Sequence, residues 1–149
     1  MTKKYYSYDE CVLDCKSLLA PIKEYNPDAI VSIARGGLLI GQLLSYGMNQ
    51  RELYSINCVH YDDTTKLDSF KISNIPDLSS FKKIVLVDDI VDSGETMVEI
   101  LKIVTKKYPQ CEIKIASIFY KNSALIMPDF KVKEAKEWID FFWEIDINR

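Results

Sequence analysis

The chain contains no apolar run of roughly 20 residues, the length that a helix needs to cross a membrane. Its opening residues, MTKKYYSYDE, carry lysines without the apolar stretch that completes a signal peptide. The sequence therefore predicts no membrane partner and a cytoplasmic location.

Clustered positive charge is also missing. The chain has 19 Lys and Arg against 22 Asp and Glu, a net charge of −3, and no basic block or stripe. Because nucleic acids and anionic membranes are bound through such clusters, the sequence predicts no nucleic-acid partner. A small ligand is the expected partner.

The sequence lacks the residues of a structural zinc site. It has a single histidine, His60, and no CxxC pair, whereas zinc sites need several thiolate or imidazole ligands at close spacing. Its four cysteines lie in stretches with helical or strand periodicity: Cys11, Cys15, Cys58 and Cys111. These thiols are predicted to be core residues.

Helical and extended patterns alternate along the chain. Its 149 residues, 48% hydrophobic and 28% charged, suit one globular domain, residues 1–149. A capping box of Ser7 and Glu10 predicts a helix from there to about Tyr25. Further helices are expected at Leu38–Met48, apolar on nearly every side and hence internal, and at Met97–Tyr108. Strands are expected at Ala29–Ala34, Leu53–Val59, Ile84–Val87 and Ile113–Tyr120. The alternation predicts an α/β fold with a mostly parallel central sheet flanked by helices.

One stretch, IVLVDDIVDSGET from Ile84 to Thr96, runs from a buried strand into three acids. In a parallel sheet, ligands gather beyond the carboxyl ends of the strands. The backbone N–H groups that follow Asp92 open a helix and form a cradle for a phosphate: Ser93, Gly94, Glu95 and Thr96. No GxxxxGK[ST] motif is present, so a nucleoside-triphosphate loop is excluded.

The adjacent carboxylates Asp88 and Asp89 need a partner, because like charges repel. A ribose diol can donate hydrogen bonds to them, and Mg²⁺ would relieve their repulsion. Taken alone, the pair also fits a solvated turn that caps a helix. A receiver domain, which also has acids after a strand, does not fit the order of residues here. The whole stretch indicates a ribose-5-phosphate site.

Ile84 to Thr96 resembles throughout the phosphoribosyl-pyrophosphate signature of the type I phosphoribosyltransferases. Arg35-Gly36-Gly37 resembles the family's pyrophosphate loop, and Tyr61 to Asp68 falls where the family has a mobile catalytic loop, with Tyr61 and Lys66 as its candidate residues. The family often has Ser-Tyr in that loop, where this chain has His60-Tyr61.

The C-terminal part narrows the resemblance. Trp138-Ile139 and Trp143-Glu144 resemble the family's C-terminal hood, formed here mainly by about residues 121–149. Alone, Trp138 is typical of a core residue and Lys121 of a solvated side chain, but their order after the signature is similar to that of the short bacterial xanthine-guanine(-hypoxanthine) phosphoribosyltransferases.

This resemblance implies an enzyme of purine salvage. It would move the phosphoribosyl group from phosphoribosyl pyrophosphate to N9 of a 6-oxopurine (guanine, xanthine or hypoxanthine), giving a nucleoside 5′-monophosphate and pyrophosphate. Mg²⁺ is the implied cofactor, and a homodimer or homotetramer is the implied assembly. A non-catalytic nucleotide-sensing regulator and a phosphoribosyltransferase for another base are the alternatives.

The resemblance also implies a role for each matching residue. Asp92 would handle the N7 proton as the catalytic residue. The ribose and 5′-phosphate would be bound by Asp88, Asp89, Ser93, Gly94, Glu95 and Thr96, with Asp89 also a Mg²⁺ ligand. Pyrophosphate would be bound by Arg35, Gly36 and Gly37, after a cis peptide at Ala34-Arg35. The purine would be bound by Lys121, Trp138 and Ile139.

Overall fold

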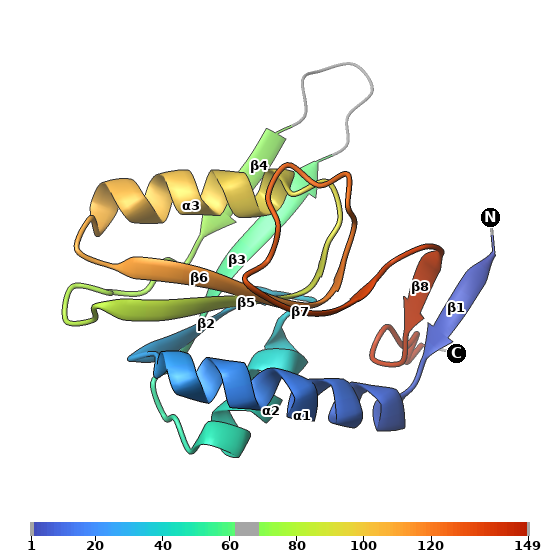
Figure 1. Cartoon of the computed structure of the whole chain (residues 1–149). Coiled ribbons are helices and arrows are strands. Elements are labelled where there is room, and N and C mark those ends of the chain that lie inside the picture. The colour runs from blue at the N-terminus through green and yellow to red at the C-terminus, as the bar shows by residue number, and fades with distance from the viewer. Residues whose placement is uncertain (1, 62–68, 149) are drawn as a thin grey trace.

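A six-stranded sheet forms the centre of the molecule (Figure 1). The computed structural model describes residues 2–61 and 69–148. The strands of this sheet, in spatial order, are β4 (Ser69–Ser73), β3 (Leu53–Tyr61), β2 (Ala29–Ala34), β5 (Lys83–Val91), β6 (Glu112–Tyr120) and β7 (Phe130–Glu134). All neighbouring strands pair in parallel except β3 and β4, which are antiparallel. The predicted α/β fold class is confirmed.

Helices cover both faces of the sheet. Figure 1 shows α1 (Tyr8–Tyr25) and α2 (Leu38–Met48) below it and α3 (Glu95–Lys107) above it. The apolar run of β5 reflects this double cover. Val85 and Val87 belong to the core on the α1 side, whereas Ile84 and Leu86 belong to the core on the α3 side. A central parallel strand thus needs apolar residues on both of its faces.

Helix α1 begins and ends where the sequence predicts. The Ser7 hydroxyl accepts a hydrogen bond from the Glu10 N–H (3.2 Å), and the Glu10 carboxylate accepts one from the Ser7 N–H (2.9 Å), which completes the capping box. Asn26, in the left-handed conformation with φ 56°, ends the helix. The predicted thiols are core residues in three cases, Cys11, Cys15 and Cys111, while Cys58 is only partly buried.

Helix α2 has the predicted bounds, but the prediction that it is internal is wrong. Its buried residues, Ile40, Gly41, Leu44 and Ser45, lie on one face. Leu38 is 45% exposed and Tyr46 is 80% exposed on the rest of the helix. The helix packs on the sheet and on α1 but has solvent on its outer side, so its apolar composition exceeds what burial requires.

A second, two-stranded sheet joins the two ends of the chain. In it β1 (Lys3–Tyr6) pairs in parallel with β8 (Trp138–Phe141), and Figure 1 shows the pair set to one side of the main sheet. The sequence patterns did not predict β1, β4, β7 or β8. These strands are four or five residues long, lie at sheet edges and carry charged residues, so they lack the apolar run that marks β5.

Among the described residues, no helix combines the length and apolar character needed to span a membrane.

Candidate active site

Three adjoining cavities open beyond the carboxyl ends of β2 and β5. The main cavity, about 780 Å³, is lined by the loop after β2, the two adjacent acids of β5 and the C-terminal segment. The side cavity, about 330 Å³, lies between the end of β5 and β8. The third, about 80 Å³ and here called the cradle, lies at the start of α3. Asp89 and Glu144 line both larger cavities, Thr96 lines the main cavity and the cradle, and Asp92 lines the side cavity and the cradle.

Asp88 and Asp89 lie where the three cavities meet. The Asp89 N–H donates to Asp88 Oδ1 (2.9 Å), and the Ile90 N–H donates to Asp89 Oδ1 (2.7 Å), so the backbone fixes both carboxyl groups. Burial and the neighbouring charge of Asp89 raise the pKa of Asp88 well above its ordinary value. Burial also raises the pKa of Asp89, although hydrogen bonds from Asp88 and the Ile90 backbone oppose the shift. The pair is therefore a site of unfavourable negative charge that a cation or a diol would relieve.

The loop Arg35-Gly36-Gly37 lies directly against this acidic pair. A Cβ on Gly36 would come within 2.3 Å of Asp89 Oδ2, and one on Gly37 within 2.3 Å of the Val87 carbonyl oxygen. Only glycine allows this close approach. The Ala34-Arg35 peptide is cis, as the family resemblance implies. Arg35 is exposed and lines the main cavity.

The cradle is formed by the turn that opens α3. Gly94 caps the helix with φ 85°, a conformation that favours glycine, and the Glu95 N–H donates to Ser93 Oγ (3.2 Å). The Leu125 N–H, from the loop after β6, donates to the Ser93 carbonyl (2.8 Å) and supports the turn from behind. The first N–H groups of α3 therefore face a small polar cavity, the arrangement that binds anions at helix N-termini.

The side cavity brings together residues from three distant parts of the sequence. Lys121 Nζ lies 2.7 Å from Asp92 Oδ1, so a lysine that follows β6 forms an ion pair with an aspartate that follows β5. Trp138 is 59% exposed and Ile139 is buried, and both line the same cavity. The exposed indole offers a flat apolar face to a ligand, and the neighbouring ion pair offers hydrogen-bonding groups to the same ligand.

Two residues that line the site were not predicted to bind a ligand. Glu144 was expected in the hood without a binding role, yet it lines both larger cavities. Burial raises its pKa, the charges of Asp89 and Asp140 raise it further, and that of Arg35 lowers it. Cys58 of β3 lines the main cavity, where burial and Asp88 raise the pKa of its thiol. Both residues reach the site through tertiary packing alone.

The predicted catalytic loop is only partly described. Tyr61 is the last residue of β3 and is 50% exposed. Lys66 lies within residues 62–68, outside the described part of the chain. His60 stacks on Phe70 of β4, with ring centroids 4.5 Å apart and planes 9° apart.

The chain belongs to the phosphoribosyl transferase domain family, which residues 1–148 match. Its structure is similar to the Helicobacter pylori xanthine-guanine-hypoxanthine phosphoribosyltransferase, with 39% identity, a TM-score of 0.90, and 99% of this chain and 97% of that chain covered. It is also similar to a purine phosphoribosyltransferase from Pyrococcus horikoshii, with 31% identity, a TM-score of 0.86, and 98% and 97% covered. The xanthine-guanine phosphoribosyltransferase of Idiomarina loihiensis is 26% identical over 131 residues, 86% of this chain and 76% of that protein.

Proposed function

We propose that this chain is a purine-salvage enzyme that transfers the phosphoribosyl group from phosphoribosyl pyrophosphate to N9 of a 6-oxopurine. The products are the nucleoside 5′-monophosphate and pyrophosphate. The observation that carries the proposal is that an acidic pair and an anion cradle, both within Asp88 to Thr96, adjoin a base-sized cavity whose other walls include Lys121 and Trp138. The similar proteins that are named as purine phosphoribosyltransferases support the proposal.

The ribose and its 5′-phosphate fit the acidic pair and the cradle. Asp88 and Asp89 would accept hydrogen bonds from the 2- and 3-hydroxyls, since an ionised carboxylate has acceptor oxygens and no donor. The phosphate would take the N–H groups of Ser93 to Thr96 and the hydroxyls of Ser93 and Thr96. This geometry holds C1 of the ribose between the main and side cavities, because Asp89 lines both.

The pyrophosphate would lie in the main cavity. Arg35 can donate two parallel hydrogen bonds to phosphate oxygens, and the Gly36 and Gly37 amides lie on the same loop. As pyrophosphate leaves, positive charge develops on the ribose, and the carboxylates below it stabilise that charge. Exclusion of water by the predicted loop, residues 61–68, would protect the cation from hydrolysis.

The residues fit a Mg²⁺ ion that the protein and the substrate bind together. The described residues contain no group of three or more His, Cys, Asp or Glu side chains able to hold a metal by themselves. Mg²⁺ commonly takes one or two carboxylates and completes its shell with water and substrate oxygens. The acidic pair, with Asp89 as the first candidate, suits that arrangement. Bound Mg²⁺ would neutralise charge on the leaving pyrophosphate.

Asp92 would take the proton that the purine loses. When N9 attacks C1 and the bond to pyrophosphate breaks, the base gives up one proton, and a carboxylate within hydrogen-bond reach of N7 can accept it. Lys121, 2.7 Å away, holds the Asp92 carboxylate in the side cavity. Its ammonium has only donors, so it would also recognise the carbonyl oxygen at C6 and disfavour the amino group of adenine. Trp138 would stack on the purine face, and the Ile139 carbonyl would accept from the N1 or 2-amino edge.

We further propose that residues 1–149 act as one phosphoribosyltransferase domain whose hood is formed by about residues 121–149. The family match over residues 1–148 and the cavity walls contributed by Trp138 to Asp146 support this. A homodimer or homotetramer and a cytoplasmic location stay predictions.

The test is an assay of the purified protein with phosphoribosyl pyrophosphate, Mg²⁺ and one purine at a time. We expect nucleoside monophosphate from guanine, xanthine and hypoxanthine, and negligible product from adenine. Calorimetry of nucleotide binding runs alongside. No product from any purine, together with tight nucleotide binding, would support a nucleotide-sensing regulator instead.

A further inference from the structure

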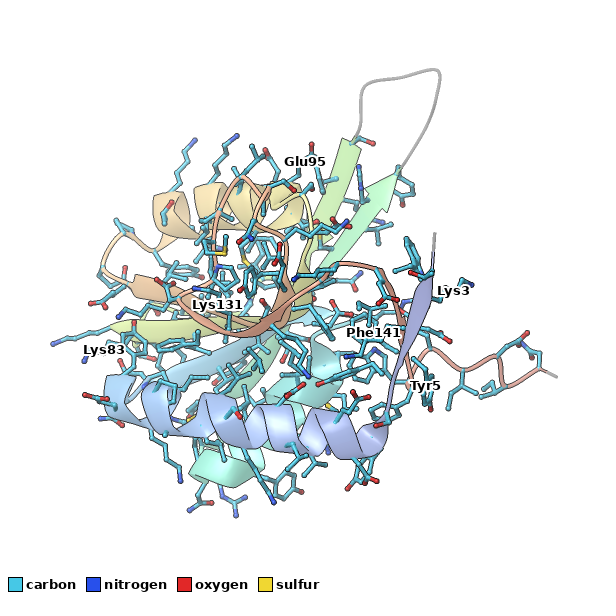
Figure 2. The ribbon with its side chains drawn as sticks, turned by 45° about the vertical axis from the view of Figure 1, so that its right-hand side comes forward. Lys3, Tyr5, Lys83, Glu95, Lys131 and Phe141 are labelled. Atoms are coloured by element: carbon cyan, nitrogen blue, oxygen red, sulfur yellow. The ribbon has the colours of Figure 1, made fainter. Side chains whose placement is uncertain are left out.

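One wall of the side cavity is formed by β8, which pairs with the N-terminal strand β1. Trp138, Ile139 and Phe141 of β8 line that cavity, and β8 pairs in parallel with β1 rather than with the main sheet. The Trp138 N–H donates to the Thr2 carbonyl (3.3 Å) and the Phe142 N–H to the Tyr6 carbonyl (3.0 Å). Figure 2 shows Tyr5 and Phe141 at the same end of the molecule, far from Glu95 at the start of α3.

Tyr6, the last residue of β1, is fixed by a buried polar group. Its ring is fully buried, and its hydroxyl donates to Asp14 Oδ2 of α1 (2.6 Å). The same oxygen accepts from Lys133 Nζ of β7 (2.9 Å). The three side chains tie β1, α1 and β7 together at one point. Burial raises the pKa of Tyr6, with the charge and hydrogen bond of Asp14 acting in the same direction, so the hydroxyl stays a donor.

The Tyr6 ring also contacts the aromatic residues behind both larger cavities. It packs edge-on against Phe119, Phe141 and Trp143, with ring centroids 5.0, 5.8 and 6.2 Å away. Phe141 lines the side cavity and Trp143 the main cavity, while none of the cavities of the site includes Tyr6. Edge-on aromatic pairs have directional preferences, so a shift of the Tyr6 ring moves its neighbours.

From these contacts we propose that Tyr6 is a positioning residue for purine binding. This proposal rests on the proposed function, since it concerns the purine that the side cavity would bind. Through Asp14 and Lys133, Tyr6 sets the position of β8 against the main sheet, and β8 in turn sets the distance from Trp138 to Lys121. The residues proposed to bind phosphoribosyl pyrophosphate lie in the loop after β2, in β5 and at the start of α3. Of the aromatic rings that Tyr6 contacts, Trp143 lines the main cavity, and it has no assigned role in binding that substrate. Loss of the Tyr6 hydroxyl therefore weakens purine binding selectively.

Tyr6→Phe is the sharpest variant because it keeps the ring and removes one hydrogen bond. Tyr25→Phe is its matched control: Tyr25 is also buried, and its hydroxyl donates to the Glu112 carbonyl (3.2 Å), on another part of the fold from the cavities. A buried acceptor that loses a donor shifts local equilibria by a factor of about 5 to 30. We expect a rise of about that size in KM for guanine in Tyr6→Phe, with KM for phosphoribosyl pyrophosphate unchanged.

Three measurements decide the outcome. Steady-state kinetics with each substrate varied give the two KM values and kcat, calorimetry with guanosine monophosphate gives binding without turnover, and thermal unfolding gives stability. A rise in KM for guanine that Tyr25→Phe does not share supports the positioning role. Equal changes in both KM values, or the same kinetics in the two variants, would overturn it. An inactive parent protein would instead refute the proposed function.

Asp14→Asn keeps the test decisive if Tyr6→Phe does not fold. The amide oxygen of asparagine still accepts from the Tyr6 hydroxyl, whereas the pairing with Lys133 loses its charge. We expect a smaller rise in KM for guanine than in Tyr6→Phe and again none for phosphoribosyl pyrophosphate. An unchanged KM for guanine in Asp14→Asn, with Lys133→Met also unchanged, would contradict the role of this group.

Discussion

The two halves of the site are built in different ways. The phosphoribosyl half comes from one continuous stretch, Asp88 to Thr96, that includes the end of the central strand β5 and the start of α3. The purine half is assembled from Lys121 after β6 and from Trp138 and Ile139 of β8, a strand outside the main sheet. Asp89 is 9% exposed in the first half, whereas Trp138 is 59% exposed in the second.

This difference separates chemistry from recognition. A reaction through a charged transition state needs groups held in one position, and a buried parallel strand with backbone hydrogen bonds supplies that. Recognition of a base needs one ion pair and one stacking surface, which a small edge sheet can carry. Changes in the first half should therefore reduce turnover, and changes in the second should reduce purine affinity.

The largest expected effect is that of Asp92→Asn. Asparagine keeps the size of the side chain but cannot take the N7 proton, so we expect kcat to fall by roughly two to four decades. Binding of phosphoribosyl pyrophosphate, measured by calorimetry, should stay nearly the same. Equal turnover in the variant and the parent at saturating substrate would remove Asp92 from the mechanism.

Lys121→Met should act on the other half. Methionine keeps the apolar stem and removes the donor to the C6 oxygen, and loss of a charged hydrogen bond costs roughly 1.5–3 kcal/mol, or about one to two decades in kcat/KM for guanine. KM for phosphoribosyl pyrophosphate should not change. Full guanine efficiency in the variant, or use of adenine by the parent, would show that the base pocket is assigned wrongly.

The same contrast decides what the sequence could predict. The phosphoribosyl half could be predicted because its residues are adjacent and follow an apolar run, although β5 continues past the predicted end at Val87 to Val91. The start of helix α1 could be predicted from the sequence because both partners of its capping box lie within four residues. In each case the physical cause is local.

The purine half was found only through a resemblance. The pairing of β1 with β8 joins residues 3–6 to residues 138–141, and no pattern in four charged and aromatic residues indicates a partner so distant. Glu144 and Cys58 were missed as site residues for the same reason. Helix α2 was predicted as internal because composition shows what can be buried, not how much of the surface neighbouring elements cover.

Asp88→Asn should raise stability while it reduces activity. The substitution removes a partly buried charge that repels Asp89, so without ligands at neutral pH we expect a gain of about 0.5–2 kcal/mol in the free energy of unfolding. Chemical denaturation measures the gain. Asp77→Asn, at an exposed turn where Ser79 donates to the carboxylate, is the control and should not become more stable. A loss of stability in Asp88→Asn would mean that the ionised pair is favourable in the free protein.

The smallest effect concerns the capping box, which fixes the turn between β1 and α1. The hydrogen bond from the Ser7 N–H lowers the pKa of Glu10, so the carboxylate stabilises the fold above its unfolded pKa. That contribution is lost as the pH falls through the lower, folded pKa. Glu10→Gln should therefore cost about 0.5–1 kcal/mol at pH 7 and progressively less below about pH 4.3, the ordinary glutamate value.

Denaturation curves of parent and Glu10→Gln at several pH values test this. Glu99→Gln is the control, because Glu99 pairs with Lys102 on the exposed side of α3 (3.1 Å) without capping a helix, and exposed pairs contribute little. The capping turn follows β1, and β1 pairs with β8 of the purine half. If the turn helps to position β1, Glu10→Gln will raise KM for guanine slightly and leave KM for phosphoribosyl pyrophosphate unchanged. A stability difference that stays constant down to pH 3 would show that the Glu10 charge has no part in the capping box.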